Sequence, residues 1–233
     1  MKNYLYLIPV RAGSKRIPNK NILDLCSKPL FTHSIEFAKE FTSNENIYVL
    51  TDSERAKTIS RKLQVKVFER SFEFSKDDTS MLDTILNFIE IEKISDDNNI
   101  VLLQPTSPFR SIKFFRKLKN IYDKNDNASS AISVVRCIFH HPSKIGKLSN
   151  DNSLELIDIP KEDNIDNHRK TKYFVISGTY YITSVKNLKL NKSFIGKNPF
   201  ALEEDLFHFC NIDTPDDFEK AKKLGQLRKC VDL

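Results

Sequence analysis

Residues 4–21 read YLYLIPVRAGSKRIPNKN, an apolar run that gives way to a basic loop. The apolar part, 4–10, is short, aliphatic and aromatic, which is typical of a buried strand. The loop, 11–21, carries four cations and one glycine, and its composition does not favour a helix. The sequence therefore predicts a first strand whose end carries a cluster of positive charge.

The same order of apolar run, polar loop and amphipathic segment recurs along the first half of the chain. Helices are expected within 29–41, 54–63, 80–94 and 112–122, and further strands within 46–53, 64–70, 99–110 and 130–137. This alternation predicts parallel strands joined by crossover helices, an α/β fold with a doubly wound, mostly parallel sheet. In such a sheet ligands bind at the carboxyl ends of the strands, where the basic loop and the segment 104–110 fall.

The second half of the chain departs from this alternation. Residues from approximately 138 to 172 are polar and poorly periodic, and we interpret 138–172 as an inserted β-hairpin arm. Regular structure returns at 173–183, and a helix is expected to begin at Pro215, capped by Asp213 or Thr214. Because 233 residues suit one sizeable core, we expect residues 1–233 to form a single domain.

Composition narrows the classes of function. The net charge of +6 and the pI near 9.0 favour an anionic partner, without choosing among nucleic acid, lipid surface and polyphosphate. The four cysteines are widely separated and lack metal-binding spacing, which predicts free thiols in a reducing compartment. No apolar run approaches the roughly 20 residues of a membrane span. We therefore expect a cytoplasmic protein with no membrane partner.

The basic loop does not match the glycine-rich phosphate loops. It lacks GxxxxGK[ST] and GxGxxG, because Gly13 is its one glycine. The positive charge must come from side chains, and arginine grips phosphate oxygens through a bidentate fork whereas lysine acts as a point charge. Taken alone, the loop is either an anion site built from Arg11, Lys15, Arg16 and Lys20 or a solvated turn.

Three motifs in order resemble one family. IPVRAGSKRIPNKN at 8–21 is similar to the signature IPARxGSKxxPxKN of the acylneuraminate cytidylyltransferases, the CMP-sialic acid synthetases and their bacterial relatives. LLQPTSPFR at 102–110 resembles a second hallmark of that family, and NIDTPDDFEKA at 211–221 resembles its C-terminal motif. The resemblance spans almost the whole chain. It implies the nucleotide-diphosphosugar transferase fold, which is Rossmann-like and agrees with the predicted sheet.

The reaction implied by the resemblance joins CTP to a nonulosonic acid, a nine-carbon 2-keto sugar acid. The anomeric hydroxyl attacks the α-phosphate in line, which gives the CMP-sugar and pyrophosphate for surface glycan biosynthesis. Such a transfer requires positive charge on the triphosphate and a divalent cation, here Mg²⁺ or Mn²⁺. No covalent enzyme intermediate is required, so the lack of a nucleophile triad is no objection.

The resemblance assigns roles to residues of the basic loop and beyond it. The implied catalytic residues are Arg11, Lys20 and Asp213, with Lys20 stabilising charge at the α-phosphate. The implied nucleotide-binding residues are Arg11, Ala12, Gly13, Ser14, Lys15, Lys20, Asn21, Arg70 and Ser80. Arg16 is expected to be spare, because family members often carry glycine there. Two alternatives stay open: a salt bridge at the strand end for Arg11, and a helix N-cap by Asp78 or Thr79 in the Ser80 segment.

The implied acceptor-sugar residues are Gln104, Thr106, Lys144, Arg169 and Gly178. An amide such as that of Gln104 suits a polyhydroxylated ligand because it both donates and accepts hydrogen bonds. The chain departs from the family around Gly178, with Ser177 in place of asparagine and Val175 in place of an arginine. These departures leave the identity of the sugar open.

The implied metal ligands are Asp213 and Asn211 in the C-terminal motif. Carboxylate oxygens are hard ligands that Mg²⁺ prefers, and residues two apart on a strand share a face. The family has aspartate at both positions, so Asn211 keeps a carbonyl oxygen but removes one negative charge. The alternative for Asp213 is the helix N-cap described above.

The resemblance also implies a homodimer in which the arm at 138–172 reaches the partner's acceptor pocket. Two other functions are alternatives. A CMP-3-deoxy-octulosonate synthetase is disfavoured because that branch departs from the loop motif GSKxxPxKN. A non-catalytic nucleotide- or RNA-binding protein would suit the basic pI and Asn211, but no aromatic RNA-binding motif is present, so no nucleic-acid partner is expected.

Overall fold

The computed structural model describes residues 2–75, 79–137, 142–157, 172–206 and 209–231. Its main feature is a seven-stranded sheet with the strand order β11-β7-β10-β6-β1-β4-β5. The strands are β1 (Asn3–Val10), β4 (Ile47–Thr51), β5 (Lys66–Glu69), β6 (Asn98–Leu102), β7 (Ser130–Arg136), β10 (Phe174–Ser184) and β11 (Pro199–Glu203). Strand β10 runs antiparallel to both of its neighbours, whereas the other pairings are parallel. The predicted mostly parallel sheet is confirmed.

Helices cover both faces of the sheet, as a doubly wound fold requires. They are α1 (Thr32–Lys39), α2 (Glu54–Lys62), α3 (Met81–Ile91), α4 (Ile112–Lys124), α5 (Val185–Asn191) and α6 (Pro215–Val231). One apolar cluster contains Phe37 of α1, Ala56 of α2 and Phe115 of α4. A second cluster on the opposite face contains Phe88 of α3 and Leu188 of α5. The alternating side chains of the central strands divide between these two clusters.

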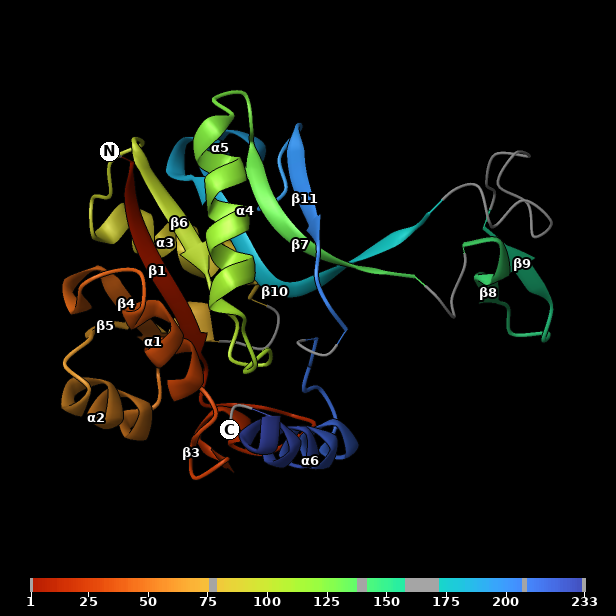
Figure 1. Cartoon of the computed structure of the whole chain (residues 1–233), viewed down its shortest axis with the longest axis horizontal. Helices are drawn as coiled ribbons and strands as arrows, with labels where there is room; N and C mark the ends of the chain where they lie inside the picture. Colours follow the sequence, from red (N-terminus) through yellow and green to blue (C-terminus); the bar gives the residue numbers. More distant parts are fainter. Residues whose placement is uncertain (1, 76–78, 138–141, 158–171, 207–208, 232–233) are drawn as a thin grey trace.

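Strands β7 and β10 continue past the rest of the sheet as a two-stranded arm, which projects from the body in Figure 1. Arg136 pairs with Phe174 at its outer end. Beyond it lie the short helix Pro142–Lys144 and a hairpin of β8 (Gly146–Leu148) and β9 (Leu154–Leu156). The inserted arm at 138–172 stays a prediction. Residues 138–141 and 158–171 of the predicted arm lie outside the described residues.

Helix α6 does not pack on the sheet faces but below the carboxyl ends of the strands (Figure 1). It lies against a small hairpin, β2 (Asp24–Leu25) and β3 (Lys28–Pro29). A third apolar cluster joins the basic loop, the segment after β6 and the chain before α6; it contains Ile17, Leu25, Leu30, Phe109, Ile212, Phe218 and Ala221. All three sequence motifs are therefore fastened to one another at a single edge of the sheet. Within the described residues, no helix combines the length and apolar character of a membrane span.

A substitution at Ile212 tests the third apolar cluster, because the Ile212 side chain is fully buried in it. We expect Ile212→Ala to lower the free energy of unfolding by about 2–5 kcal/mol, through lost burial and the cavity left behind. Urea denaturation of both proteins measures the change. Leu227→Ala is the control, since Leu227 of α6 is 61% exposed and its truncation should stay within about 0.5 kcal/mol. Equal losses in the free energy of unfolding for the two substitutions would contradict a stabilising role of this cluster.

Candidate active site

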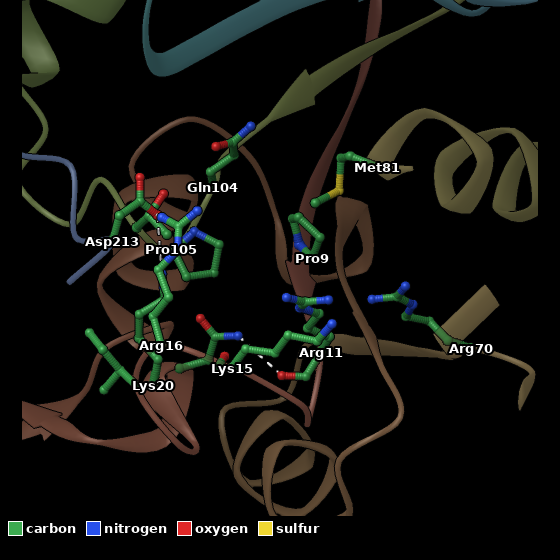
Figure 2. A pocket seen from close by; sticks show the side chains of 14 residues that line it. Pro9, Arg11, Lys15, Arg16, Lys20, Arg70, Met81, Gln104, Pro105 and Asp213 are labelled. Atoms are coloured by element: carbon green, nitrogen blue, oxygen red, sulfur yellow. Dashed lines mark hydrogen bonds and ion pairs between the residues drawn. The ribbon is translucent and has the colours of Figure 1, made fainter. Parts of the chain in front are cut away.

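A cavity of about 310 Å³ opens at the carboxyl ends of β1, β5 and β6. The predicted site residues that line it are Arg11, Ser14, Lys15, Lys20, Asn21, Arg70, Gln104, Thr106 and Asp213. Figure 2 shows Arg11, Lys15 and Arg70 on one side and Asp213 with Arg16 on the other, with Gln104 above. Five lining side chains are cationic, whereas Asp213 is the one carboxylate among the lining residues described. Such a pocket attracts an anion carrying several charges.

The basic loop is shaped by two side chains that bond to its backbone. The amide of Ala12 donates to Oδ1 of Asp52 at 2.8 Å. The side-chain Nδ2 of the buried Asn21 donates to the carbonyl oxygen of Arg11 at 3.2 Å. The predicted contacts Ala12 and Gly13 are not among the residues that line the cavity. Asp52 was not predicted from the sequence, although it follows a strand end as the other site residues do.

Arg70 enters the cavity from the end of β5, and its side chain is 7% exposed. Its Nη2 donates to the carbonyl oxygen of Phe74. Burial lowers the pKa of Arg70, while the charge of Asp52 opposes that shift. Nε of Arg70 is covered and makes no hydrogen bond within the described chain. A buried donor of this kind is available to an anionic ligand.

Lys20 connects the basic loop to the C-terminal motif. Its Nζ donates to the carbonyl oxygen of Ile212 at 2.6 Å and lies 3.6 Å from Oδ1 of Asp213. The Lys20 side chain is 13% exposed, and this burial lowers its pKa, with the Asp213 charge acting in the opposite direction. The result is a positive charge held in one place by the carbonyl group of Ile212, which is 192 positions away in sequence.

Asp213 lies among donors. Besides Lys20, Nη1 of Arg16 lies 3.9 Å from Oδ1, and Nδ2 of Asn211 donates to Oδ2 at 2.8 Å. Arg16 thus lines the cavity and lies near Asp213, although its side chain is 70% exposed; that Arg16 is spare stays a prediction. Its approach to the motif at 211–213 depends on the geometry of the loop, which the sequence does not show.

The N-cap of α6 is Thr214 and not Asp213. The amide of Asp217 donates to Oγ1 of Thr214 at 3.2 Å, and the amide of Thr214 donates back to Oδ2 of Asp217 at 2.9 Å. This reciprocal pair is a capping box. The carboxylate of Asp213 is therefore left for the cavity.

The donor set at 211–213 suits a divalent cation that is held largely by a bound phosphate. No cluster of three or more histidine, cysteine or acidic side chains with metal-binding geometry occurs among the described residues. Asp213 offers one carboxylate and Asn211 one amide, and the two side chains are in contact. Mg²⁺ is commonly bound through one or two carboxylates, with substrate phosphates and waters completing the octahedron. The residues present fit that arrangement.

The predicted acceptor residues divide into two groups. Gln104 and Thr106 line the cavity, and the Thr106 carbonyl accepts a hydrogen bond from the Ile212 amide at 2.9 Å. Gly178 is adjacent, since a Cβ there would lie 3.9 Å from Oε1 of Gln104. Lys144, in contrast, is exposed on the arm and is not among the lining residues. Arg169 lies outside the described residues.

Ser80 caps helix α3. Its Oγ accepts from the amide of Asp83 at 3.0 Å and donates to the Asp83 carboxylate at 2.6 Å. The N-cap that the sequence placed at Asp78 or Thr79 therefore belongs to Ser80, which is not among the lining residues. The neighbouring Met81 does line the cavity. A nucleotide contact by Ser80 stays a prediction.

Comparisons with known proteins match these observations. The CMP-N,N'-diacetyllegionaminic acid synthase of Legionella pneumophila subsp. pneumophila is 29% identical over 232 residues, covering 97% of each chain. The pseudaminic acid cytidylyltransferase of Campylobacter jejuni subsp. jejuni serotype O:23/36 is 31% identical over 230 residues, covering 96% of each. A solved structure of CMP:2-keto-3-deoxy-manno-octonic acid synthetase complexed with CTP shares the fold, with a TM-score of 0.71 at 18% identity; the match covers 97% of this chain and 99% of that one.

The family follows from the extent of the match. A family model described as Cytidylyltransferase matches residues 5–233. That range includes the basic loop, the segment after β6 and the motif before α6, which the structure brings together around one cationic cavity. The chain therefore belongs to the cytidylyltransferase family and is a nucleotidyltransferase.

Proposed function

We propose that this nucleotidyltransferase moves CMP from CTP to the anomeric hydroxyl of a sialic-acid-like nonulosonic acid, in surface glycan biosynthesis. The observation that carries the proposal is the cavity itself, which combines five cations with the amide of Gln104 at its other end. Two similar proteins are named for CMP-legionaminic acid synthesis and for pseudaminic acid cytidylyl transfer. Both sugars are nonulosonic acids, which supports this substrate class.

The cationic side of the cavity suits the triphosphate. Arg11 and Arg70 can bind phosphate oxygens through bidentate guanidinium contacts, and Lys15 provides a point charge. Ser14 and Asn21 lie along the same loop and add uncharged polar groups. Preorganised charge of this kind stabilises the transition state of phosphoryl transfer without requiring a covalent enzyme intermediate.

Lys20 is the residue that we assign to the reacting phosphate. It lies between the basic loop and the motif at 211–213, and its ammonium group is held by the Ile212 carbonyl. In the reaction, the anomeric oxygen bonds to the α-phosphorus, the bond from that phosphorus to the bridging oxygen breaks, and pyrophosphate leaves. The hydroxyl proton is released. Negative charge grows on the phosphate oxygens, where the Lys20 ammonium stabilises it.

Asp213 and Asn211 would hold a divalent cation, Mg²⁺ or Mn²⁺, together with substrate phosphates. When bound, such an ion neutralises phosphate charge. Arg16 and Lys20 both lie within 4 Å of the Asp213 carboxylate, so the protein supplies part of that positive charge itself.

The acceptor side of the cavity suits a polyhydroxylated acid. Gln104 and Thr106 follow β6, and Gly178 next to Gln104 leaves space because it has no side chain. This is also where the chain departs from the family pattern, at Ser177 and Val175. The choice among sialic, legionaminic and pseudaminic acids therefore rests with residues at this end.

The arm supports the proposal of a homodimer. Its hairpin exposes large apolar side chains, with Leu148 at 65%, Leu154 at 61% and Leu156 at 54%. Exposed apolar surface of this extent is typical of an interaction site. In a dimer with two-fold symmetry the same surface would pack against its own copy or against the partner's body. Lys144, near the tip, would then reach the partner's acceptor pocket.

The remaining partners follow from the same proposal. CTP and the nonulosonic acid are the substrates, and neither a nucleic acid nor a membrane is required for the reaction. The wide spacing of the four cysteines in the sequence is what supports the expected reducing, cytoplasmic compartment.

The central experiment is a panel of acceptors assayed for pyrophosphate. We expect release only when CTP, Mg²⁺ and one nonulosonic acid are present together, and little release with 3-deoxy-octulosonate. Omission of each component in turn is the control. Turnover with none of the sialic, legionaminic and pseudaminic acids would refute the proposal. Faster turnover with 3-deoxy-octulosonate would assign the protein to that acceptor instead.

A pH profile tests Lys20. Because burial lowers its pKa below the ordinary lysine value, kcat should fall with rising pH sooner than an exposed lysine would allow. Lys20→Ala should reduce kcat by about 10²–10³-fold. Lys20→Arg should move the alkaline limb to higher pH, since arginine stays protonated. Lys62→Arg, at the exposed end of α2, should leave the limb in place. An unmoved limb in Lys20→Arg would exclude Lys20 as its cause.

Light scattering tests the dimer. We expect the wild-type mass to be that of two chains, and Leu154→Glu to shift it toward one, because the charge would be buried in the interface. Leu190→Glu is the matched control, since Leu190 is 74% exposed but lies on α5 and not on the arm. A wild-type monomer at assay concentration would rule out the dimer.

A further inference from the structure

Glu204 is a buried carboxylate that the mechanism above does not use. It follows β11 directly, and its amide donates to the carbonyl oxygen of Val134 at 2.7 Å, so its backbone continues the pairing with β7. The residue is 3% exposed. Both carboxyl oxygens are covered, and neither makes a well-formed hydrogen bond within the described chain. A carboxylate is costly in such a place unless another charge opposes it.

Two hydroxyls and one cation act on the pKa of the Glu204 carboxyl group. The hydroxyls belong to Ser177 and Thr179 of β10, and the cation is the guanidinium of Arg110. Burial raises the pKa of Glu204, while these three groups act against that shift. Oγ1 of Thr179 is itself covered and without a hydrogen bond among the described residues. Glu204 therefore belongs to a polar cluster enclosed behind β10.

Arg110 links this cluster to the acceptor side of the cavity. Its Nη2 donates to the carbonyl oxygen of Gln104 at 2.7 Å, its Nε to that of Thr179 at 3.3 Å, and its Nη1 to Oγ of Ser34 at 2.9 Å. Burial lowers the pKa of Arg110 to about 10, so the group is still a cation at neutral pH. Tyr180 and, after it, the Glu204 carboxylate raise that pKa and thus oppose the effect of burial.

The part of β10 that Arg110 holds is irregular. Ile176 pairs with Val134 and Tyr181 pairs with Ile132, so residues 177–180 stand opposite Ser133 alone. Gly178 lies within this bulge, with a φ of +78° that favours glycine. It is the same residue whose added Cβ would approach Oε1 of Gln104. Arg110 therefore bonds to both walls of the acceptor side, Gln104 through its carbonyl and the bulge through Thr179.

We propose that Glu204 is a positioning residue for acceptor binding. As the counter-charge behind the bulge at 177–180, it keeps Arg110 in the conformation that fixes Gln104 relative to Gly178. This inference rests on the proposed function, since it concerns the acceptor end of the same cavity. The nucleotide end is built from Arg11, Lys20 and Arg70 on other segments, so CTP binding does not depend on Glu204.

Glu204→Gln removes the charge while keeping the shape of the side chain. Arg110 then lacks its counter-charge, and its bonds to the Gln104 and Thr179 carbonyls weaken. We expect KM for the acceptor to rise by about 10- to 100-fold, because a small displacement of Gln104 would misalign its contacts with the acceptor. KM for CTP should change less than about twofold. Glu203→Gln, one residue earlier and exposed on β11, should change neither constant.

A double variant separates positioning from simple stability. Arg110→Met combined with Glu204→Leu removes both charges, so it should recover most of the thermal stability that Glu204→Gln loses. The acceptor KM should stay raised, because no side chain then holds the Gln104 carbonyl. Recovery of both Tm and the acceptor KM in the double variant would overturn the inference. So would an unchanged acceptor KM in a folded Glu204→Gln protein.

Failure of the proposed function would be distinguished from failure of this inference, because the wild-type protein would then show no turnover in the acceptor panel. The inference is then decided by amide hydrogen exchange, which needs no substrate. Relative to wild type, Glu204→Gln should exchange faster at 104–107 and at 177–180, while Glu203→Gln should match the wild type. Equal exchange in the two variants at both segments would overturn the inference.

Discussion

The apolar cluster beneath the carboxyl ends of the strands is the contact on which the site depends. Five cationic side chains at one edge of a sheet repel one another, and nothing in the basic loop alone would keep them together. Ile17 of that loop and Ile212 before α6 are buried in the same cluster. Hydrophobic burial does not depend on charge, and it thus holds the loops in place against the repulsion among the cations. The site is assembled by packing and left with excess positive charge.

That excess charge has a consequence for the ligand-free protein. The carboxylate of Asp213 is surrounded by Lys20, Arg16 and the amide of Asn211. Burial of the Lys20 side chain already lowers the pKa of Lys20. A bound triphosphate would bring several negative charges to the same place. It would satisfy donors that lack partners in the described chain, such as Nε of Arg70. The geometry is therefore complementary to an anion and not to the empty state.

The acceptor end is organised by a different kind of interaction. There a single buried guanidinium, Arg110, holds two backbone carbonyls and lies against the rings of Phe37 and Tyr180. Buried polar networks of this type specify one arrangement when they are satisfied. The proposed nucleotide end is thus lined by charged side chains, whereas the proposed acceptor end is organised by backbone carbonyls that Arg110 holds.

Much of the fold followed from local patterns. Alternating apolar and amphipathic segments predicted the strands and helices, and strand ends rich in polar residues predicted the edge at which the cavity lies. The basic loop alone left an anion site and a solvated turn as alternatives, and the roles of Gln104 and Asp213 were implied by the resemblance of their motifs to one family. Such signals are short-range, so a sequence carries them directly.

Tertiary structure decided what depends on residues distant in the chain. The pairing of Arg16 with Asp213, the hydrogen bond from Ala12 to Asp52 and the electrostatic interaction of Glu204 with Arg110 each join separate segments. The sequence by itself determined the α/β alternation and the positive charge at the first strand end. Which cations share a carboxylate, and which carboxylate is buried behind the acceptor wall, was decided only by the packing of the chain. Burial and long-range contacts set the energy of a charged group, and neither is a property of its sequence neighbours.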